Sequence, residues 1–399
     1  MQEHALGVAS HSLYNPVPSD MRANERIISR FNERPSSLRS ATWFVPNFEH
    51  VLFGGISTIL RCMSWMAQEH AVAHRLVLFD NASVTDSYVR SMIVKEFPAL
   101  SGIDIVIPPS GRAPFLDFDE LPPTDIAVCT IWYSAYALLR FNATRAKFYF
   151  VQDYEPSFYP AGTLSALSEA TYRFGFAGLV NTPGLGQAYA SYGNPTFSFV
   201  PAVERIDLDV VKPSAFPNKP VQLVIYARPS TPRNAFELLA ATARLVKQQF
   251  GDRVRIVCAG EDWDPSSFGL DGVIENLGLL DSREAVHSLY LESDIGLFCM
   301  FSKHPSYQPF EYFAAGVAVV TTLNPATKWA LRDRDNCMLS EPFPSALAEA
   351  VARLIDDREL RLKLARSGAE QIAGVSWNHQ FEEMWRFITA AQKPELRDR

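Results

Sequence analysis

The chain has 399 residues, of which 47% are hydrophobic and 20% are charged, and its formal net charge is −7. This length predicts two domains, each with enough apolar side chains to form a core without a disulfide or a metal staple. A net acidic chain has no basic excess for displacing counterions, so broad binding to nucleic acid is excluded. Any phosphate site must therefore be a local cluster of cations.

The cysteines and the hydropathy pattern indicate the compartment. The five cysteines show neither CxxC pairing nor metal-ligand spacing, which is typical of buried reduced thiols. The N-terminal stretch lacks the apolar core of a signal peptide, and no segment approaches the length of a membrane span. We therefore expect a cytoplasmic protein, and peripheral contact with the inner face of the membrane stays open. The cysteines are Cys62, Cys129, Cys258, Cys299 and Cys337.

The first half of the chain alternates short apolar strands with helical patterns. Residues 1–40 are polar and carry three prolines, so they are interpreted as an N-terminal extension. From 41 to 203 the alternation predicts an α/β domain with a parallel sheet. Thr182-Pro183 should cap and start a helix after the sixth strand. The predicted strands are 42–45, 75–79, 103–107, 125–130, 147–151, 178–181 and 197–200.

Two positions in this half are candidates for binding. Gly54-Gly55 stand between the first strand and a helix, where glycine allows close backbone approach to a ligand. A tight turn without function explains the pair equally well. Asp153 follows the strand 147–151 and so lies at a carboxyl end, where α/β sheets bind ligands.

A proline-rich stretch separates the two halves. Four prolines lie between residues 201 and 220, with little periodicity, which predicts a linker at 204–220. The βα alternation then resumes in a second domain, 221–376. The segment 377–399 carries a last helix, which we expect to cross back to the N-terminal domain. Predicted strands here are 221–227, 254–259, 273–277, 295–300 and 317–322, and predicted helices are 235–250, 283–292, 346–355, 359–372 and 377–391.

The stretch 294–322 is the strongest candidate for a site. A buried strand leads into a polar loop at 301–308, Pro309 fits the first turn of a helix, and Gly316 fits its end. A helix start favours an anion such as phosphate, whereas Glu311 in that first turn would repel one unless it binds hydroxyls. The combination indicates a ligand with both a diphosphate and a sugar.

Two arginines flank the loop after the first strand of the second domain. Arg228 follows the strand 221–227 directly, and Arg233 precedes the next helix. Guanidinium groups at a strand end can bind diphosphate oxygens bidentately. The alternative is that both are solvated surface arginines.

Other motifs carry less information. Four Asp-x-Asp triplets could hold a divalent metal against a diphosphate, but none lies between a strand and a helix start, so solvated loops are the interpretation. We expect no metal and no cofactor. There is no nucleophile elbow, P-loop or zincin helix. The triplets are 117–119, 207–209, 262–264 and 333–335.

The second half resembles the retaining glycosyltransferases of family 4, which have the GT-B fold. The likeness runs from about 221 to 377 and rests on IYARPSTPRNAFELL, LGLLDSREAVHSLYLESDIGLF and PFEYFAAGVAVVTT. HPSYQPFE, YARPSTPRNAF and VQDYEPSFY are similar to the WsaF-type rhamnosyltransferases of bacterial surface polysaccharide assembly. This resemblance implies two Rossmann-like parallel-sheet domains facing across a cleft, an acceptor domain at 41–203 and a nucleotide-sugar donor domain at 221–376.

The resemblance also implies substrates and roles. The donor would be dTDP-linked rhamnose, and the acceptor a glycan or lipid-linked glycan. The sugar would be transferred without a metal ion and with retention of the anomeric configuration. Arg228 and Arg233 would hold the diphosphate as catalytic residues, with Asp153 as a third catalytic residue facing the acceptor. Glu311 would bind the nucleotide ribose. The other donor-binding residues would be Gly55, Lys303, His304, Pro305, Ser306, Tyr307 and Gln308.

Two positions depart from the family pattern. Lys303 stands where the first glutamate of the Glu-x7-Glu motif is expected, and a cation cannot accept hydrogen bonds from sugar hydroxyls. Arg233 replaces the usual lysine, which keeps the charge and changes the geometry. Neither change forbids transfer, but both weaken the inference of sugar specificity from ordinary members.

Three functions stay open at this point. A glycosyltransferase is the leading hypothesis, and a GT-B epimerase or nucleotide-sugar hydrolase is a second. A third is a non-catalytic nucleotide-sugar-binding module docked in a polysaccharide-assembly complex, which Lys303 keeps in consideration.

Overall fold

The computed structural model describes residues 14–34, 36–48, 50–52, 54–78, 85–107, 120–203, 219–280 and 282–389. The chain divides into two compact units. Unit 1 comprises Met1–Val200 and Asn378–Arg399, and unit 2 comprises Pro201–Trp377. Most of the predicted linker, 204–218, lies outside the described residues.

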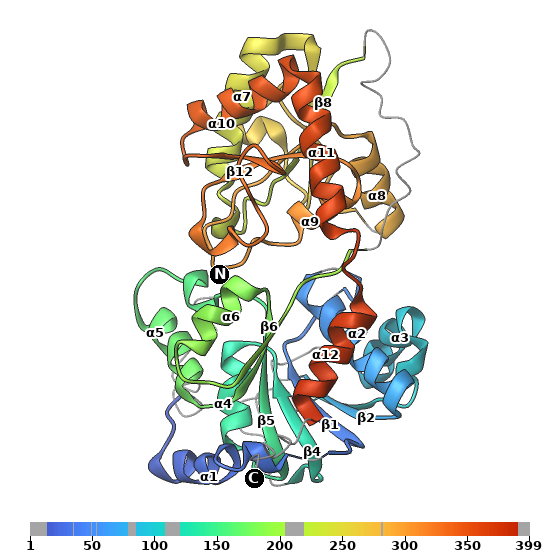
Figure 1. Ribbon diagram of the computed structural model, residues 1–399, viewed down its shortest axis with the longest axis vertical. Helices are drawn as coiled ribbons and strands as arrows, with labels where there is room; N and C mark the ends of the chain where they lie inside the picture. Colours follow the sequence, from blue (N-terminus) through green and yellow to red (C-terminus); the bar gives the residue numbers. More distant parts are fainter. Residues whose placement is uncertain are drawn as a thin grey trace, which may run out of the picture. The chain divides into compact units, whose positions relative to one another are not determined.

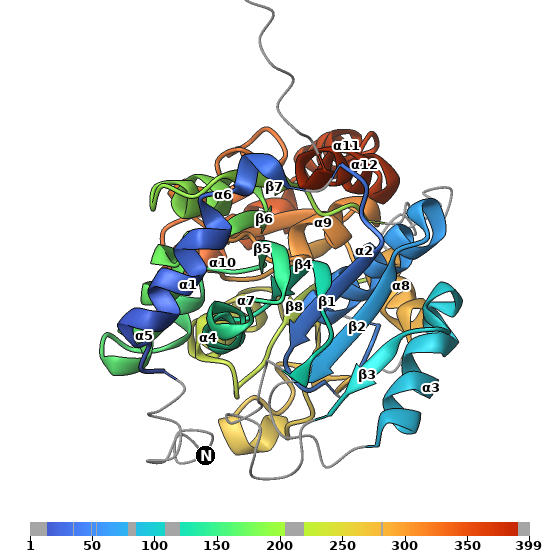
Figure 2. The ribbon, with the colours of Figure 1, turned by 90° about the horizontal axis from the view of Figure 1, so that it is seen from below.

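Unit 1 contains a seven-stranded parallel sheet in the order β3-β2-β1-β4-β5-β6-β7 (Figure 2). Chain order therefore runs outward in both directions from the neighbouring strands β1 and β4. All seven strands fall where the alternating pattern predicts them. They are β1 (Ser40–Val45), β2 (Ala73–Leu78), β3 (Asp104–Val106), β4 (Thr124–Cys129), β5 (Thr144–Val151), β6 (Ala177–Asn181) and β7 (Thr196–Phe199).

The C-terminal helix completes unit 1. Helix α12 lies beside α2 in Figures 1 and 2. The Sγ of Cys62 lies 3.7 Å from the Sδ of Met384, and the Val200 amide donates to the Gln380 side chain at 2.9 Å. These contacts join α12 to helix α2 and to the segment directly after β7. The helices of unit 1 are α1 (Pro18–Ile28), α2 (Gly54–His70), α3 (Asp86–Glu96), α4 (Trp132–Arg140), α5 (Thr163–Ala170), α6 (Pro183–Ala190) and α12 (Trp377–Thr389).

The N-terminal segment that the sequence marks as an extension contributes helix α1. Its Asn24 is fully buried, and the amide nitrogen of that side chain donates to the Phe174 carbonyl at 2.7 Å. The Tyr14 ring lies 5.2 Å from the Trp132 ring at the start of α4. The N-terminal segment is therefore held by a buried hydrogen bond from α1 and by aromatic packing of Tyr14, which precedes that helix.

Unit 2 contains a six-stranded parallel sheet in the order β10-β9-β8-β11-β12-β13. Successive residues of a strand point to opposite faces of this sheet, and both faces carry a core. The strands are therefore apolar along their whole length. The strands are β8 (Val221–Tyr226), β9 (Val254–Ala259), β10 (Glu275–Asn276), β11 (Ile295–Leu297), β12 (Ala318–Thr322) and β13 (Cys337–Ser340).

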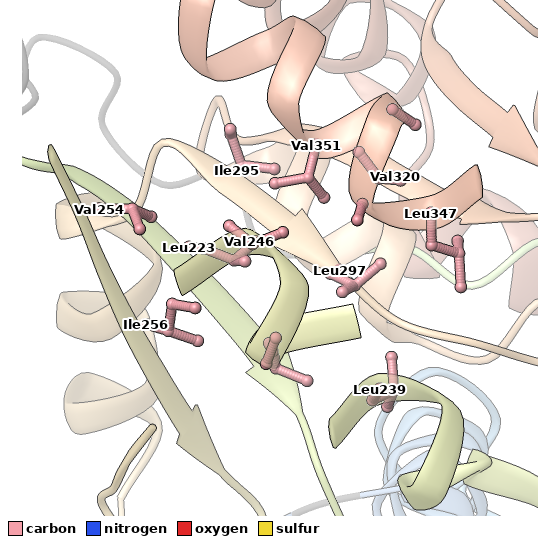
Figure 3. Packing of buried hydrophobic residues seen from close by; sticks show 14 of the residues in the cluster. Leu223, Leu239, Val246, Val254, Ile256, Ile295, Leu297, Val320, Leu347 and Val351 are labelled. Atoms are coloured by element: carbon pink, nitrogen blue, oxygen red, sulfur yellow. The ribbon is translucent and has the colours of Figure 1, made fainter. Parts of the chain in front are cut away.

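One face of this sheet packs against α7 and α10 to form the core shown in Figure 3. The other face packs against α8 and α9. Labelled core residues in Figure 3 are Leu223, Leu239, Val246, Val254, Ile256, Ile295, Leu297, Val320, Leu347 and Val351. The helices are α7 (Phe236–Phe250), α8 (Arg283–Glu292), α9 (Gln308–Ala314), α10 (Pro344–Asp356) and α11 (Arg358–Ile372).

Some predicted details are wrong. The predicted strand 295–300 ends at Leu297. Residues 298–300 are buried like strand residues, but they form a loop. The predicted strand 273–277 is only Glu275–Asn276. Thr182 has a φ of 92°, and its hydroxyl makes no hydrogen bond to helix α6, so it does not cap that helix. An apolar run alone does not distinguish a strand from a buried loop.

All five cysteines are buried and unpaired, as their spacing predicts. In the described parts of the chain, no helix combines the length and the hydropathy that crossing a bilayer requires.

Candidate functional site

The strand order of unit 2 places the candidate site. Strand β8 neighbours β11, with Ile225 opposite Leu297, and the chain order reverses between these two strands. Open α/β sheets bind ligands at the carboxyl ends of strands next to such a reversal. The loop after β8 carries both predicted arginines, and the loop after β11 is the predicted donor loop. The fold therefore brings the two segments to one edge of one sheet.

Arg228 lies at the start of the loop after β8. Its side chain is 37% exposed, and its Nε lies 3.9 Å from the Oε2 of Glu261. At that separation the carboxylate is a loose partner, and exposed pairs of this kind contribute little stability. The guanidinium is thus partly accessible at the strand end.

Glu261, in the loop after the neighbouring strand β9, organises the loop after β8. Its Oε2 accepts a hydrogen bond from the Ser230 hydroxyl at 2.6 Å and from the Ser230 amide at 3.3 Å. Gly260, directly before it, has a φ of 126°, and a Cβ there would lie 2.9 Å from the Tyr226 ring. Glycine is therefore required for this close approach. The role of Glu261 was not predicted, although it follows the strand 254–259 by two residues.

Arg233 lies in the same loop, in the short 3-10 helix Pro232–Asn234 just before α7. Its side chain is partly buried. Ala235, which precedes α7, has a φ of 52°, a left-handed conformation that is unfavourable for a residue with a Cβ. Such strain persists only where the surroundings hold the backbone, so this loop is a defined turn rather than a loose connection.

The donor loop after β11 has a buried and an exposed part. His304 and Pro305 are buried, whereas Lys303 is exposed. Ser306 has a φ of 69°, and its amide donates to the Nδ1 of His304 at 2.9 Å. The Ser306 hydroxyl in turn hydrogen-bonds the side chain of Gln308. His304 thus shapes the turn, with Nδ1 acting as an acceptor and therefore unprotonated.

Asn324 fastens the donor loop to the next strand. Its side-chain amide donates to the Ser302 carbonyl at 2.6 Å and to the Met300 carbonyl at 3.3 Å. The role of Asn324 was not predicted from the sequence. The sequence signal for this role is a polar side chain two positions after the predicted strand 317–322. That position lies at the same edge of the sheet as the donor loop.

Replacing Asn324 with alanine should loosen the donor loop. Two buried carbonyls would lose their donor, at a cost of about 1–3 kcal/mol. Hydrogen–deuterium exchange of peptides covering 298–307 should accelerate about tenfold or more, while exchange in β8 stays unchanged. Asn276→Ala serves as the control, because its side-chain amide donates to the Glu261 and Trp263 carbonyls after β9 instead. Equal exchange in the donor loop of both variants would contradict the role of Asn324.

Glu311 lies in the first turn of α9, as predicted. Its Oε2 is 3.3 Å from the Tyr290 hydroxyl. Burial raises the pKa of Glu311 to about 7, against the opposing effects of the Tyr290 hydrogen bond and the Arg283 charge. Its carboxyl group is therefore partly neutral at pH 7, which weakens the repulsion of a phosphate, and in its ionised form it accepts hydroxyl donors.

Asp153 follows β5 by two residues, and Gly55 lies in the first turn of α2, in contact with Gln152. The Gln152 side chain donates to the Gly55 carbonyl at 2.9 Å, and a Cβ on Gly55 would lie 2.7 Å from that side chain. The Oδ1 of Asp153 accepts from the Tyr154 amide at 2.7 Å. These two residues share an edge of the unit 1 sheet, and the other predicted residues share an edge of the unit 2 sheet.

Beside Asp153, Glu155 is buried in a group of aromatic residues. Its carboxyl group accepts hydrogen bonds from the Trp132 amide and from the Tyr149 hydroxyl, the latter at 2.9 Å. Burial raises the pKa of Glu155 to about 8. Its contacts tie the segment after β5 to the start of α4, which is a structural role.

The aspartate triplets are engaged in local turns where they are described. Asp264 accepts from the Ser266 amide at 3.0 Å, and Asp333 accepts from the Leu339 amide at 2.9 Å. The triplets at 117–119 and 207–209 lie outside the described residues. Within the described residues, no group of three or more His, Cys, Asp or Glu side chains is placed to hold a metal ion.

Two family models match this chain. The model described as WsaF, N-terminal domain matches residues 44–179, and that described as WsaF, C-terminal domain matches 221–352. Together they cover more than half of the chain, one in each unit. The chain belongs to the WsaF family. This WsaF-family chain is also similar to the O-antigen biosynthesis protein RfbC of Myxococcus xanthus, with 39% identity over 352 residues.

That alignment covers 88% of the WsaF-family chain and only 27% of RfbC. The chain thus spans about a quarter of the length of this relative. The matched part of RfbC contains counterparts of both units, because 352 residues exceed either unit alone.

Solved structures of other proteins share the fold of the WsaF-family chain. TarM of S. aureus has a TM-score of 0.67 at 10% identity, and covers 89% of this chain and 99% of its own. HepE of Anabaena in complex with UDP-glucose has a TM-score of 0.63 at 15% identity, with 87% and 98% covered. Sucrose-phosphate synthase of Thermosynechococcus elongatus has a TM-score of 0.63 at 13% identity, with 87% and 97% covered. The predicted GT-B fold of two parallel-sheet domains is confirmed.

Proposed function

We propose that this chain transfers a sugar, rhamnose, from a dTDP-linked donor onto a glycan acceptor in bacterial surface polysaccharide assembly. The observation that carries the proposal is the placement of two guanidinium groups in one loop beside the donor loop. Arg228 and Arg233 both lie between β8 and α7, at the edge where the sheet order reverses. A diphosphate is the ligand that such a pair suits best.

The chemistry follows from this placement. As the bond between the anomeric carbon and the diphosphate breaks, negative charge grows on the departing phosphate oxygens. Arg228 and Arg233 stabilise that charge more strongly than the charge of the intact donor, which is the condition for faster transfer. In the proposed reaction, no metal ion and no cofactor take part. The anomeric configuration of the transferred sugar is retained.

Glu311 holds the other end of the donor. Its carboxylate accepts hydrogen bonds from ribose hydroxyls, and the Tyr290 contact favours this ionised form against the opposing effect of burial. The donor sugar lies against residues 303–308. Lys303 replaces a glutamate of ordinary members, so the sugar is held through other groups of that loop.

The comparisons support the substrate class. RfbC is named as an O-antigen biosynthesis protein, and the HepE structures hold UDP, glucose or UDP-glucose. TarM has been crystallised with UDP and glycan-type ligands. A nucleoside-diphosphate sugar and a glycan are thus the expected substrates, and the resemblance to the WsaF-type rhamnosyltransferases suggests the thymine base and the rhamnose. A lipid-linked acceptor would bring the protein to the inner face of the membrane.

A donor panel tests the proposal. The purified chain is incubated with dTDP-rhamnose, UDP-glucose or GDP-mannose, with and without O-antigen-type glycan acceptors, in EDTA. We expect acceptor-dependent release of dTDP from dTDP-rhamnose. Rapid release of free sugar without acceptor would favour the hydrolase, and an isomerised donor would favour the epimerase. Binding of the nucleotide without transfer to any acceptor would favour the non-catalytic module.

A further inference from the structure

Tyr290 contacts Glu311 from a different element. It lies near the end of α8, its side chain is buried, and its hydroxyl is 3.3 Å from the Oε2 of Glu311. Its ring packs against the Tyr312 ring with centroids 4.9 Å apart and an angle of 80° between the planes. This edge-to-face contact fixes the ring, so the hydroxyl is held at one place beside the carboxylate.

We infer that Tyr290 is a positioning residue for the donor site: its hydroxyl holds the Glu311 carboxylate in the orientation and charge state that receives ribose hydroxyls. This inference rests on the proposed function, in which Glu311 binds the ribose. The hydroxyl uses one lone pair of Oε2 and restrains rotation of the carboxyl group. The remaining oxygen lone pairs are then presented to the ligand.

The groups around Glu311 determine how its charge depends on pH. Tyr290 and Arg283 act on it from α8, and the neighbouring Tyr312 lies next to it on α9. Tyr226, at the end of β8, adds to the electrostatic environment of Tyr290 and Tyr312. Burial raises the pKa of Glu311 to about 7, and the Tyr290 hydrogen bond opposes that rise.

Removing the hydroxyl should therefore raise the pKa of Glu311 further. The ionised fraction at pH 7 would fall, whereas at pH 9 the carboxyl group would be largely ionised in both proteins. The pKa of Tyr290 itself is raised well above its ordinary value, so the wild-type hydroxyl still donates at pH 9. The loss of nucleotide affinity should therefore depend on pH if the positioning contact is lost, and should not depend on pH if only packing is disturbed.

The experiment compares Tyr290→Phe with wild type in the full chain. Dissociation constants for dTDP and for UDP are measured by calorimetry at pH 7 and pH 9. We expect Y290F to weaken binding by roughly fivefold at pH 7 and by roughly twofold or less at pH 9. Tyr312→Phe is the matched control, because it removes a buried hydroxyl that makes no hydrogen bond within the described structure. Its affinity should match wild type at both pH values.

A second readout does not need the nucleotide. The carboxyl band of Glu311 is assigned by infrared difference against Glu311→Gln, and its titration midpoint should rise in Y290F and stay unchanged in Y312F. An unchanged midpoint in Y290F, or a binding deficit equal at both pH values, overturns the inference. If Glu311→Gln weakens binding and Y290F does not, only the role of Tyr290 fails. If Glu311→Gln and Arg228→Ala both bind the nucleotides normally, the proposed function fails with it.

Discussion

Replacing Arg228 with alanine is expected to lower kcat for sugar transfer by about 10²–10³-fold, the size seen when one preorganised donor to a developing charge is removed. The side chain is partly exposed at a strand end, and its ion pair with Glu261 is loose. The melting temperature should therefore change little. Arg233→Ala should cause a loss of similar size, because both guanidiniums lie in one loop between β8 and α7.

Two further variants make this test specific. Arg228→Lys keeps the charge and loses the bidentate geometry, so it should recover only part of the activity. Arg255→Ala is the matched control, since Arg255 lies near the start of β9 with a side chain 46% exposed and pairs with Glu275 at 2.7 Å. Near-normal turnover in both Arg228→Ala and Arg233→Ala would contradict the diphosphate clamp, whatever the result for Arg255→Ala.

Replacing Leu297 with alanine is expected to lower the free energy of unfolding of unit 2 by about 2–5 kcal/mol. Leu297 is the last residue of β11 and is fully inaccessible to solvent, in the core between the sheet and helices α7 and α10 (Figure 3). The truncation removes apolar contacts and leaves a cavity that close-packed neighbours fill only in part.

Urea unfolding followed by circular dichroism measures this effect. Leu245→Ala is the control, because Leu245 lies on α7 in the same unit and is 38% exposed. Its truncation should cost about 0.5 kcal/mol or less. Equal losses in the two variants would contradict the placement of the core.

Much of the fold can be predicted from local sequence patterns. The alternation of apolar strands with helices predicts every strand of unit 1, because parallel strands buried on both faces are apolar throughout. The same rule misplaces the end of β11, since residues 298–300 are buried without being strand. The side-chain cap predicted at Thr182 is absent because that residue adopts a positive φ. No local sequence pattern indicates this conformation.

The sequence predicts which residues stand at strand ends and helix starts, but not which partners their side chains contact. Arg228 and Glu311 could be named from strand ends and helix starts, and the sheet order then places their loops at one edge. The contacts of Glu261 with Ser230 and of Tyr290 with Glu311 could not be predicted, because they depend on which strands and helices become neighbours in the fold. His304 illustrates a further limit: its burial and its bond to the Ser306 amide arise from the turn itself.

A crystal structure of the chain soaked with dTDP tests the central claim most directly. The account predicts that the phosphate oxygens lie within hydrogen-bond distance of the Arg228 and Arg233 guanidiniums, with the ribose hydroxyls on Glu311. A diphosphate bound far from these residues, or bridged by a metal ion to carboxylates, would contradict it.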